Sequence, residues 1–368
     1  MPQATFMIKP VSNLCNMQCQ YCFYDDVSKN RKQASHGIMS AETLETIVKK
    51  ALEYADTSCS FAFQGGEPTL AGLDFYKSLL NFQKIYNKKN IAINNSIQTN
   101  GLNLNAQWAN FFAKNKFLVG LSIDGTQPLH DKHRKTANGA GTYDKIQKTA
   151  SIFQGHKVEY NILCVVNNDV ACAPEDVYLN LKKHKYLQFI PCINYFDENS
   201  PTLNVAAYAN FLKITFDLYY KDFMRGKYVS IRNFDNYINV LSGNPPEQCG
   251  MAGMCSRYFL IEADGGVFPC DFYVLDEWKI GNINEDSLFR MIKSEASHLF
   301  INSSKHVDEK CTKCKWHGLC RGGCRRYREP MVNNTLSLNS NCEAFNDFFE
   351  YSYSRMVEIA KMALSPSL

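Results

Sequence analysis

The sequence of 368 residues lacks the segments that would mark a membrane or exported protein. Its first residues, MPQATFMIKPVSN, contain no basic leader followed by a long apolar core. No apolar run elsewhere reaches the length that crosses a bilayer. Internal repeats and low-complexity tracts are lacking as well. We therefore expect a cytoplasmic, globular protein with no membrane partner.

A strong charge of either sign is also lacking. Forty basic and thirty-six acidic residues leave a formal charge of +4, and no long run gathers the basic ones. This composition gives no reason to expect nucleic acid as a partner. A hydrophobic content of 45% in a chain of this length can bury a large core and fits one large domain with a smaller one.

What the sequence does have is cysteine, fifteen residues in all. Without an export signal they belong in a reducing compartment, where structural disulfides are rare, so metal ligation is the leading interpretation. Three lie close together near the start and eight lie between Cys249 and Cys342. Of the scattered remainder, Cys59 and Cys164 fall in apolar, strand-like runs, where we expect them to pack in the core.

Short apolar runs alternate with longer amphipathic stretches up to about residue 195. The pattern predicts strands at Thr5–Lys9, Ser58–Phe63, Ile91–Gln98, Phe117–Ile123, Val158–Val165 and Leu187–Ile190. It predicts helices at Ala41–Tyr54, Leu73–Tyr86, Ala106–Lys114, Tyr143–Phe153 and Pro174–Lys183, the first with Ser40 as N-cap. Six strand–helix units predict an α/β fold, an open or partial (β/α)6 barrel that binds its ligands at the carboxyl ends of the strands.

After a helical stretch at Tyr208–Phe223, Gly, Pro and Cys become dense from Ser242 to Arg328. We interpret residues 233–368 as a second, loop-rich domain that closes with a helix at Phe345–Met362, and residues 1–232 as the first domain. A loop-rich domain with little periodic core needs support besides apolar burial, and metal clusters can give it.

The first cysteine group, Cys15-x-x-x-Cys19-x-x-Cys22, follows the first predicted strand. Three thiolates this close can hold three irons of a [4Fe–4S] cube and leave the fourth iron open. A zinc site or three buried cysteines is the alternative, although structural zinc sites take four ligands. The motif resembles that of the radical S-adenosylmethionine (SAM) superfamily, in which SAM binds the open iron.

Further strand ends strengthen this resemblance. Gln64-Gly65-Gly66-Glu67-Pro68 ends the second predicted strand, and its glycines permit close approach of a ligand. By resemblance, the cofactor-binding residues are Gln64, Gly65, Gly66, Glu67, Gln98, Asn100, Ser122, Asp124 and Arg134. Each segment alone is also compatible with an ordinary turn, because Asn-Gly and Asp-Gly are common turn pairs.

The second cysteine set resembles the SPASM domain of peptide-modifying radical SAM enzymes. Its pattern runs from Cys255 through Gly265 to Cys270, continues as CxxCx5Cx3C, and ends with Cys342. The resemblance implies two auxiliary clusters and therefore three [4Fe–4S] clusters in all. It assigns Cys249, Cys255, Cys270 and Cys324 to the first auxiliary cluster, and Cys311, Cys314, Cys320 and Cys342 to the second. A pair of zinc ribbons is the alternative.

Within this group the chain is most similar to the anaerobic sulfatase-maturating enzymes. The similarity runs almost end to end, through CNMQCQYCFY, FAFQGGEPTLAGL, SIQTNG, KFLVGLSIDG, CGMAGMC, GGVFPCDFYVLDEWKIGNI and CKWHGLCRGGCRR. It implies that Asp271, directly after Cys270, is the general base, whereas the residue alone reads as a turn or cap. Candidate contacts to the substrate chain are Tyr24, Gln64 and the segment Leu187–Cys192, above all Leu187 and Gln188.

The reaction implied is oxidation of a Cys or Ser side chain to formylglycine after a 5′-deoxyadenosyl radical takes a β-hydrogen. The expected partners are an unfolded sulfatase or a peptide with a Cys/Ser-x-Pro-x-Arg motif, and a flavodoxin or ferredoxin as electron donor. One alternative is a SPASM enzyme that modifies a ribosomal peptide by thioether formation, crosslinking or epimerisation. The absence of a leader-binding domain before the first strand disfavours it. The other is a non-catalytic electron carrier or zinc-binding module, which would not need the SAM-binding strand ends.

Overall fold

The computed structural model describes residues 4–196, 202–332 and 335–364. The chain divides into two compact units that interleave along the sequence. The first unit comprises residues 1–122, 131–160 and 257–300, and the second comprises residues 123–130, 161–256 and 301–368. Because each unit contains segments from both sides of residue 232, this division does not test the expected domain boundary there, which stays a prediction.

An open sheet forms the core of the first unit. Four parallel neighbours come from the N-terminal part of the chain: β1 (Ala4–Ile8), β3 (Ser58–Phe63), β4 (Ala92–Thr99) and β5 (Leu118–Ser122). On the other side of β1 the sheet continues with β10 (Phe259–Ile261), β11 (Gly266–Phe268) and β12 (Gly281–Asn282). β10 is parallel to β1, with Phe6 opposite Phe259, and the last two strands are antiparallel.

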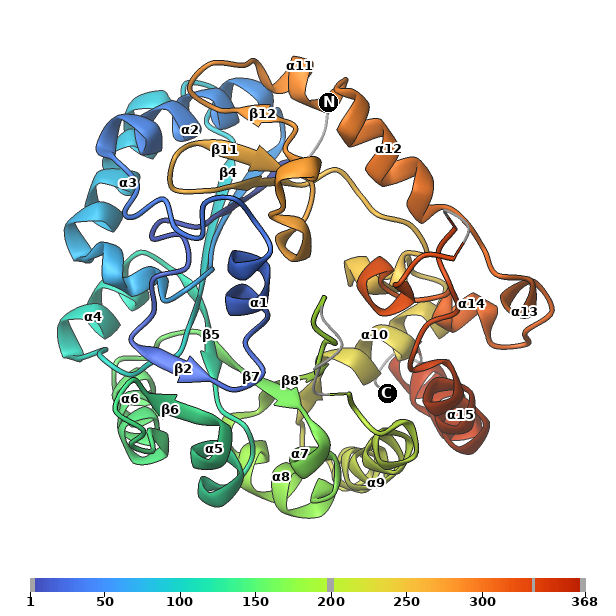
Figure 1. Cartoon of the computed structure of the whole chain (residues 1–368). Coiled ribbons are helices and arrows are strands. Elements are labelled where there is room, and N and C mark those ends of the chain that lie inside the picture. Colours follow the sequence, from blue (N-terminus) through green and yellow to red (C-terminus); the bar gives the residue numbers. More distant parts are fainter. Residues whose placement is uncertain (1–3, 197–201, 333–334, 365–368) are drawn as a thin grey trace. The chain divides into compact units, whose positions relative to one another are not determined.

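Amphipathic helices cover this sheet, as the sequence pattern predicts. In α2 (Ala41–Tyr54) the buried residues Leu44, Ile47, Val48 and Ala51 recur at helical spacing, and the Ser40 side chain accepts a hydrogen bond from Thr43 N–H. The other helices of this unit are α1 (Phe23–Lys29), η1 (Pro68–Ala71), α3 (Leu73–Tyr86), α4 (Ala106–Lys114), α6 (Tyr143–Gly155), η4 (Asp271–Tyr273), η5 (Asp276–Trp278) and α11 (Leu288–Ile292). Figure 1 shows α2 and α3 side by side outside the strands.

The second unit holds three parallel strands, β7 (Tyr160–Val166), β8 (Tyr186–Pro191) and β9 (Ser230–Ile231). Its helices are α7 (Asn168–Ala171), α8 (Pro174–Leu181), η2 (Lys182–His184), α9 (Val205–Met224), α10 (Arg232–Leu241), η3 (Cys249–Met251), α13 (Glu309–Thr312), α14 (His317–Cys320), η6 (Arg325–Arg328) and α15 (Cys342–Leu364). Two further helices have residues in both units, α5 (Gln127–His133) and α12 (Glu295–Ser304). Among the described residues, no helix is both long and apolar enough to cross a membrane.

Aromatic packing joins the long helices of the second unit. Phe216 of α9 lies edge-on to Phe348 of α15 with ring centroids 5.7 Å apart, and Phe234 of α10 stacks on Phe348 at 5.4 Å. The expected C-terminal helix is therefore confirmed as an element with a packed face, and it begins three residues earlier than predicted, at Cys342.

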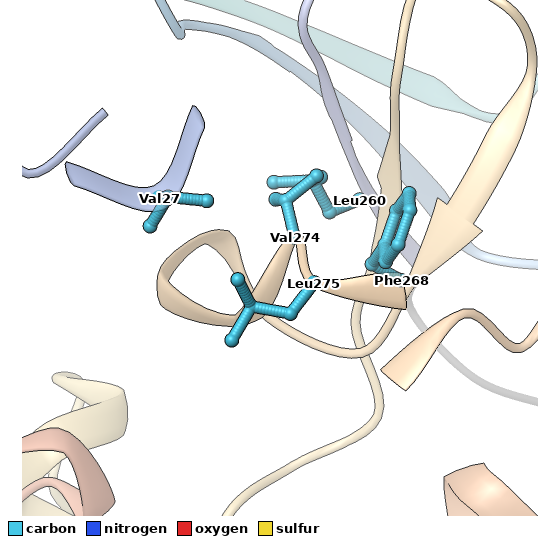
Figure 2. Packing of buried hydrophobic residues seen from close by; sticks show 5 residues of the cluster. All are labelled: Val27, Leu260, Phe268, Val274 and Leu275. Atoms are coloured by element: carbon cyan, nitrogen blue, oxygen red, sulfur yellow. The ribbon is translucent and has the colours of Figure 1, made fainter. Parts of the chain in front are cut away.

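A small apolar cluster fixes the segment after β11 against α1. It consists of Val27, Leu260, Phe268, Val274 and Leu275, all at most 6% exposed (Figure 2). Burying a side chain of this size contributes about 1.5–3 kcal/mol. The cluster matters for the site because it brackets Asp271 in the chain, and because Phe23, next to Tyr24, packs against it.

Candidate functional site

The loop after β1 carries the first three cysteines, all with free thiols. A short pair of strands, β2 (Met17–Cys19) and β6 (Arg134–Thr136), braces the loop and sets Cys19 opposite Arg134. Met17 N–H points at the Cys15 sulfur at 3.4 Å. Burial raises the pKa of Cys22, while the N–H groups of Asp25 and Tyr24 lower it. The loop therefore offers hydrogen bonds to sulfur, as a cluster-binding loop does.

Loss of solvation raises the pKa of Cys15 to about 12, and the nearby Glu67, Cys19 and Cys22 add to this rise. The three sulfurs are thus close enough to repel one another as thiolates. Because thiolates and not thiols bind iron, cluster assembly on this loop should release protons.

Glu67 ties the strand ends to this loop. Its Oε1 accepts hydrogen bonds from Thr69 N–H (3.1 Å), Thr69 Oγ1 (2.6 Å) and Thr99 Oγ1 (2.8 Å), and its Oε2 accepts one from Asn100 N–H (2.8 Å). The Asn100 side chain in turn donates to Asn16 Oδ1 at 2.8 Å and lies 3.7 Å from the Cys15 sulfur. Glu67 is 1% exposed, and its buried carboxylate links Thr69, Thr99 and Asn100 by hydrogen bonds next to the cysteine loop.

The two glycines before Glu67 are required by close backbone approach. Gly66 has φ +53°, and a Cβ there would lie 2.1 Å from the Leu14 carbonyl oxygen. Gly65 has φ +81°, and a Cβ there would meet the aliphatic stem of Lys9 at 2.4 Å. Any other residue would push the cysteine loop or the lysine away.

The remaining predicted SAM contacts are spread over both units. Arg134 is buried, with a guanidinium nitrogen 3.9 Å from the Cys19 sulfur and its charge over the Tyr21 ring. Gln64 is buried and lies near Met7, whereas Gln98 is exposed on β4. Ser122 ends β5 in the first unit, and Asp124 is buried in the second, where its Oδ1 accepts a hydrogen bond from Val165 N–H at 2.9 Å.

The expected general base lies in the same unit as the cysteine loop. The Tyr24 hydroxyl donates to Asp271 Oδ2 at 2.7 Å, while Asp271 Oδ1 is buried without a hydrogen-bond partner in the described part of the chain. Burial raises the pKa of Asp271 to about 6, against the lowering effects of the Lys9 charge and the Tyr24 hydrogen bond. Burial and the neighbouring Asp271 raise the pKa of Tyr24 well above its usual value, so Tyr24 remains a donor.

Sequence reasoning missed the charged network beside this pair. Lys9 Nζ lies 3.3 Å from Glu262 Oε2, and Arg31 Nη1 donates to the same oxygen at 2.5 Å. Lys9 and Glu262 are fully buried, and the Lys9 ammonium lies over the Tyr24 ring at 5.2 Å. The available signal was a charged residue directly after each of two buried strands, β1 and β10.

The auxiliary cysteines also have free thiols. In the second unit, burial raises the pKa of Cys320 and the nearby Cys342, Cys311 and Cys314 add to this rise, while burial and the nearby Cys249 and Cys255 raise the pKa of Cys324. Cys270 belongs to the first unit. Burial raises the pKa values of Cys255 and Cys320 to about 11 and that of Cys324 to about 12.

No three His, Cys, Asp or Glu side chains in the described ranges converge as ligands of a single metal ion. The ligands of an iron–sulfur cube bind different irons and so need not converge on one point. The grouped thiols, with backbone N–H groups near Cys15, Cys22 and Cys324, fit clusters in their donor chemistry.

The candidate substrate contacts on β8 differ in exposure. Leu187 is 2% exposed and packs inside the second unit. Gln188 is half-buried, and its Oε1 accepts a hydrogen bond from Arg232 Nη1 at 3.1 Å. Cys192, at the end of the segment, is buried, as are Cys59 and Cys164, which confirms the expected core packing of the latter two.

Two family models match the chain. The radical SAM superfamily matches residues 10–177, and the SPASM iron–sulfur cluster-binding domain matches residues 249–315.

Full-length relatives match as well. The chain is 48% identical to a cysteine-type anaerobic sulfatase-maturating enzyme of Clostridium novyi, over 98% of both chains. It is 45% identical to the enzyme of the same name from Clostridium perfringens, over 98% of this chain and 99% of that one. A serine-type enzyme of Bacteroides thetaiotaomicron is 32% identical over 94% of this chain and 88% of its own length.

Solved structures give the same result. Native anSMEcpe with bound AdoMet (SAM) is similar with a TM-score of 0.93 and 44% identity, over 97% of this chain and 99% of that one. The same protein with AdoMet and the Cp18Cys peptide has a TM-score of 0.94 and 43% identity, over 98% of this chain and 100% of that one. Streptococcus suis SuiB, bound to its precursor peptide, shares only the fold, at 16% identity and a TM-score of 0.65 over 93% of this chain and 76% of that one.

Proposed function

Because the chain belongs to the radical SAM family of anaerobic sulfatase-maturating enzymes, we propose that it oxidises a cysteine side chain of a sulfatase to formylglycine. The observation that carries the proposal is the Tyr24–Asp271 pair in the unit that holds the cysteine loop. It supplies a buried carboxylate with one hydrogen-bonded oxygen and one oxygen that has no partner in the described part of the chain and can accept a substrate proton.

We assign the first cluster to Cys15, Cys19 and Cys22, and the two auxiliary clusters to the eight later cysteines as the sequence pattern divides them. Bound SAM and this first cluster supply a 5′-deoxyadenosyl radical for hydrogen abstraction. Asn100 and Arg134 reach the sulfurs of this loop, and we assign Gly65 and Gly66, whose backbone packs closely against Lys9 and Leu14, to the SAM site. We assign the remaining SAM contacts to Gln64, Glu67, Gln98, Ser122 and Asp124.

In this proposal Asp271 Oδ1 accepts the proton of the substrate thiol. The Tyr24 hydroxyl donates to the other carboxylate oxygen, Oδ2, and so restricts rotation of the carboxylate. Although burial raises the pKa of Asp271 to about 6, the carboxylate is still mostly ionised at neutral pH, and the raised pKa makes it a stronger base than an exposed aspartate. Tyr24, Gln64 and Gln188 remain our candidates for contacts to the peptide chain, and buried Leu187 would reach it only after local rearrangement.

We propose cysteine rather than serine as the target, because the cysteine-type relatives are 45–48% identical and a serine-type relative is 32% identical. The substrate would be an unfolded sulfatase segment of the form Cys-x-Pro-x-Arg, bound as an extended peptide. A flavodoxin or ferredoxin of the cytoplasm would deliver the electrons.

The test is anaerobic incubation of the cluster-loaded protein with SAM, a reductant, and two peptides that differ only in Cys or Ser at the target position. Mass spectrometry should find formylglycine faster with the Cys peptide. Formation of 5′-deoxyadenosine with both peptides unmodified would contradict the proposal and favour modification of a different peptide, the alternative with thioether, crosslink or epimer as product.

A further inference from the structure

Three arginines follow Cys324 and point into the interior of the second unit. Arg325, Arg326 and Arg328 are 3%, 6% and 3% exposed, and the same segment provides one carboxylate, that of Glu329. Burying a guanidinium is costly unless an opposite charge lies nearby. The segment therefore carries more buried positive charge than its own carboxylate can balance.

Glu329 is shared by two of these arginines. Arg325 Nε lies 3.3 Å from Glu329 Oε1, and Arg326 Nη1 lies 3.9 Å from Oε2. Arg325 also donates to Ser303 Oγ at 2.7 Å. Glu329 therefore forms its ion pairs with Arg325 and Arg326, not with Arg328.

Arg328 is held by backbone carbonyl groups instead. Its guanidinium donates to the carbonyl oxygens of Ser337 (3.3 Å), Ser304 (3.4 Å) and His306 (2.5 Å). Among the described residues no carboxylate lies within ion-pair distance of it. Carbonyl dipoles fix the orientation of the group but do not neutralise its charge.

Three of the four groups whose negative charge opposes the burial of Arg328 are cysteines. Burial lowers the pKa of Arg328, and the charges of Cys311, Asp308, Cys255 and Cys320 act against this lowering. Ser304 adds a direct connection, because its hydroxyl accepts a hydrogen bond from Cys255 N–H at 2.8 Å while its carbonyl oxygen binds Arg328. Gly322, whose N–H points at the Cys320 sulfur, gives a second connection, because a Cβ there would lie 3.8 Å from Arg328 Nη1. Arg328 thus lies near cysteines that we assign to different auxiliary clusters.

We infer that Arg328 is the shared counter-charge of the two auxiliary clusters and raises the reduction potentials of both. This inference rests on the proposed cluster ligation and not on the identity of the substrate. A cube with four thiolate ligands is negatively charged and becomes more so when reduced. A fixed, buried cation stabilises the reduced form, so each cluster accepts an electron more readily.

Neighbouring groups should act on one cluster only. Arg325 acts on Cys255, a ligand of the first auxiliary cluster in our assignment. Asp308 acts on Cys311, a ligand of the second, with the opposite sign. Asp308 also caps α13 by accepting a hydrogen bond from Lys310 N–H, a role that Asn can fill.

The test is a redox titration of the auxiliary clusters, followed by electron paramagnetic resonance. Replacement of Cys15, Cys19 and Cys22 by Ala provides a background in which only the auxiliary clusters titrate. In this background Arg328→Gln should lower both midpoint potentials, whereas Arg328→Lys, which keeps the charge, should leave both near the parent values. Arg325→Gln should lower one midpoint only. Arg355→Gln, which removes a charge that is paired with Asp217, is the matched control and should change neither.

Unchanged midpoints in Arg328→Gln at full iron content would overturn the inference, and so would an equal shift in Arg328→Lys. If Arg328→Gln loses iron, the Asp308→Asn variant provides the test. It should raise the midpoint potential of one auxiliary cluster. Two unchanged midpoint potentials would refute the proposed electrostatic effect of the charges around the clusters. A parent protein with iron for fewer than two clusters would instead contradict the ligation proposed above, and with it any shared counter-charge.

Discussion

The two oxygens of Asp271 have different surroundings, and the proposed chemistry depends on this difference. The Tyr24 hydroxyl donates to Oδ2, whereas Oδ1 is buried and has no hydrogen-bond partner among the described residues. The apolar cluster around Phe268 and Val274 fixes the backbone on either side, so the carboxylate is aimed by packing as well as by the hydrogen bond. The proposed general base is therefore positioned by three elements, α1, β11 and η4, none of which has a catalytic signature of its own.

Replacement of Asp271 by Asn keeps the shape and the Tyr24 contact but removes the base. We expect formylglycine formation to fall about 100-fold or more, because general bases contribute on that order. Production of 5′-deoxyadenosine should continue, since it does not require this carboxylate. Mass spectrometry of the peptide and chromatography of the nucleoside measure the two separately. Equal loss of both products would show that Asp271 has a structural role instead.

Gly66 offers a second test at the level of one residue. Gly66→Ala places a Cβ against the Leu14 carbonyl, whereas Gly226→Ala, at a positive φ of +69°, meets no atom within 4 Å. We expect Gly226→Ala to cost about 1 kcal/mol of unfolding free energy, and Gly66→Ala to cost more and to weaken SAM binding. Urea unfolding and equilibrium dialysis with SAM make the comparison. Equal behaviour of the two variants would rule out the close approach as a constraint.

Elements with a strong local signal were predicted accurately. The helices at 41–54, 73–86 and 106–114 have the predicted bounds because their apolar stripes are local features, and the first and third also begin at a side-chain N-cap. The six predicted strands are present to within two residues at either end. The parallel pairing of β10 with β1 could not be predicted, because it joins residues about 250 positions apart and β10 has only three residues.

The network of Lys9, Arg31 and Glu262 depends on this same long-range pairing and gives a pH-dependent test. Burial raises the pKa of Glu262, but the charges of Lys9 and Arg31 outweigh it and hold the pKa below the usual value. Such a group stabilises the fold above its unfolded pKa, and the contribution is lost as the pH falls through the folded pKa. Glu262→Gln should therefore cost about 3–5 kcal/mol at pH 7. In urea unfolding, the difference from the parent protein should shrink below about pH 4. A difference that is independent of pH would contradict this account.

At the scale of the whole molecule, the sequence predicted the family and the cysteine groups, and the full-length relatives confirm the family. The assignment of individual cysteines to clusters came from the family's interleaving and remains a proposal. The spacing of the eight cysteines between residues 249 and 342 does not by itself say which of them bind the same cluster. The arginines after Cys324 had no recognisable motif, because their effect depends on burial and on which cysteines they face.

Iron content tests the count of clusters. Three [4Fe–4S] clusters require about twelve irons per chain. Replacement of Cys15, Cys19 and Cys22 by Ala should remove about a third of this iron and abolish SAM cleavage, because the open iron is lost. Replacement of Cys59 and Cys164 is the control and should leave the iron content unchanged. An unchanged iron content in the triple variant would exclude the first cysteine group as a cluster site.

The most direct measurement of the central claim uses a Cys-x-Pro-x-Arg peptide with deuterium on the β-carbon of the target cysteine. It is incubated anaerobically with SAM and the cluster-loaded protein. The account predicts formylglycine in the peptide and one deuterium in each molecule of 5′-deoxyadenosine formed with it. Formylglycine without deuterium in the nucleoside, or deuterium transfer that leaves a product other than formylglycine, would contradict it.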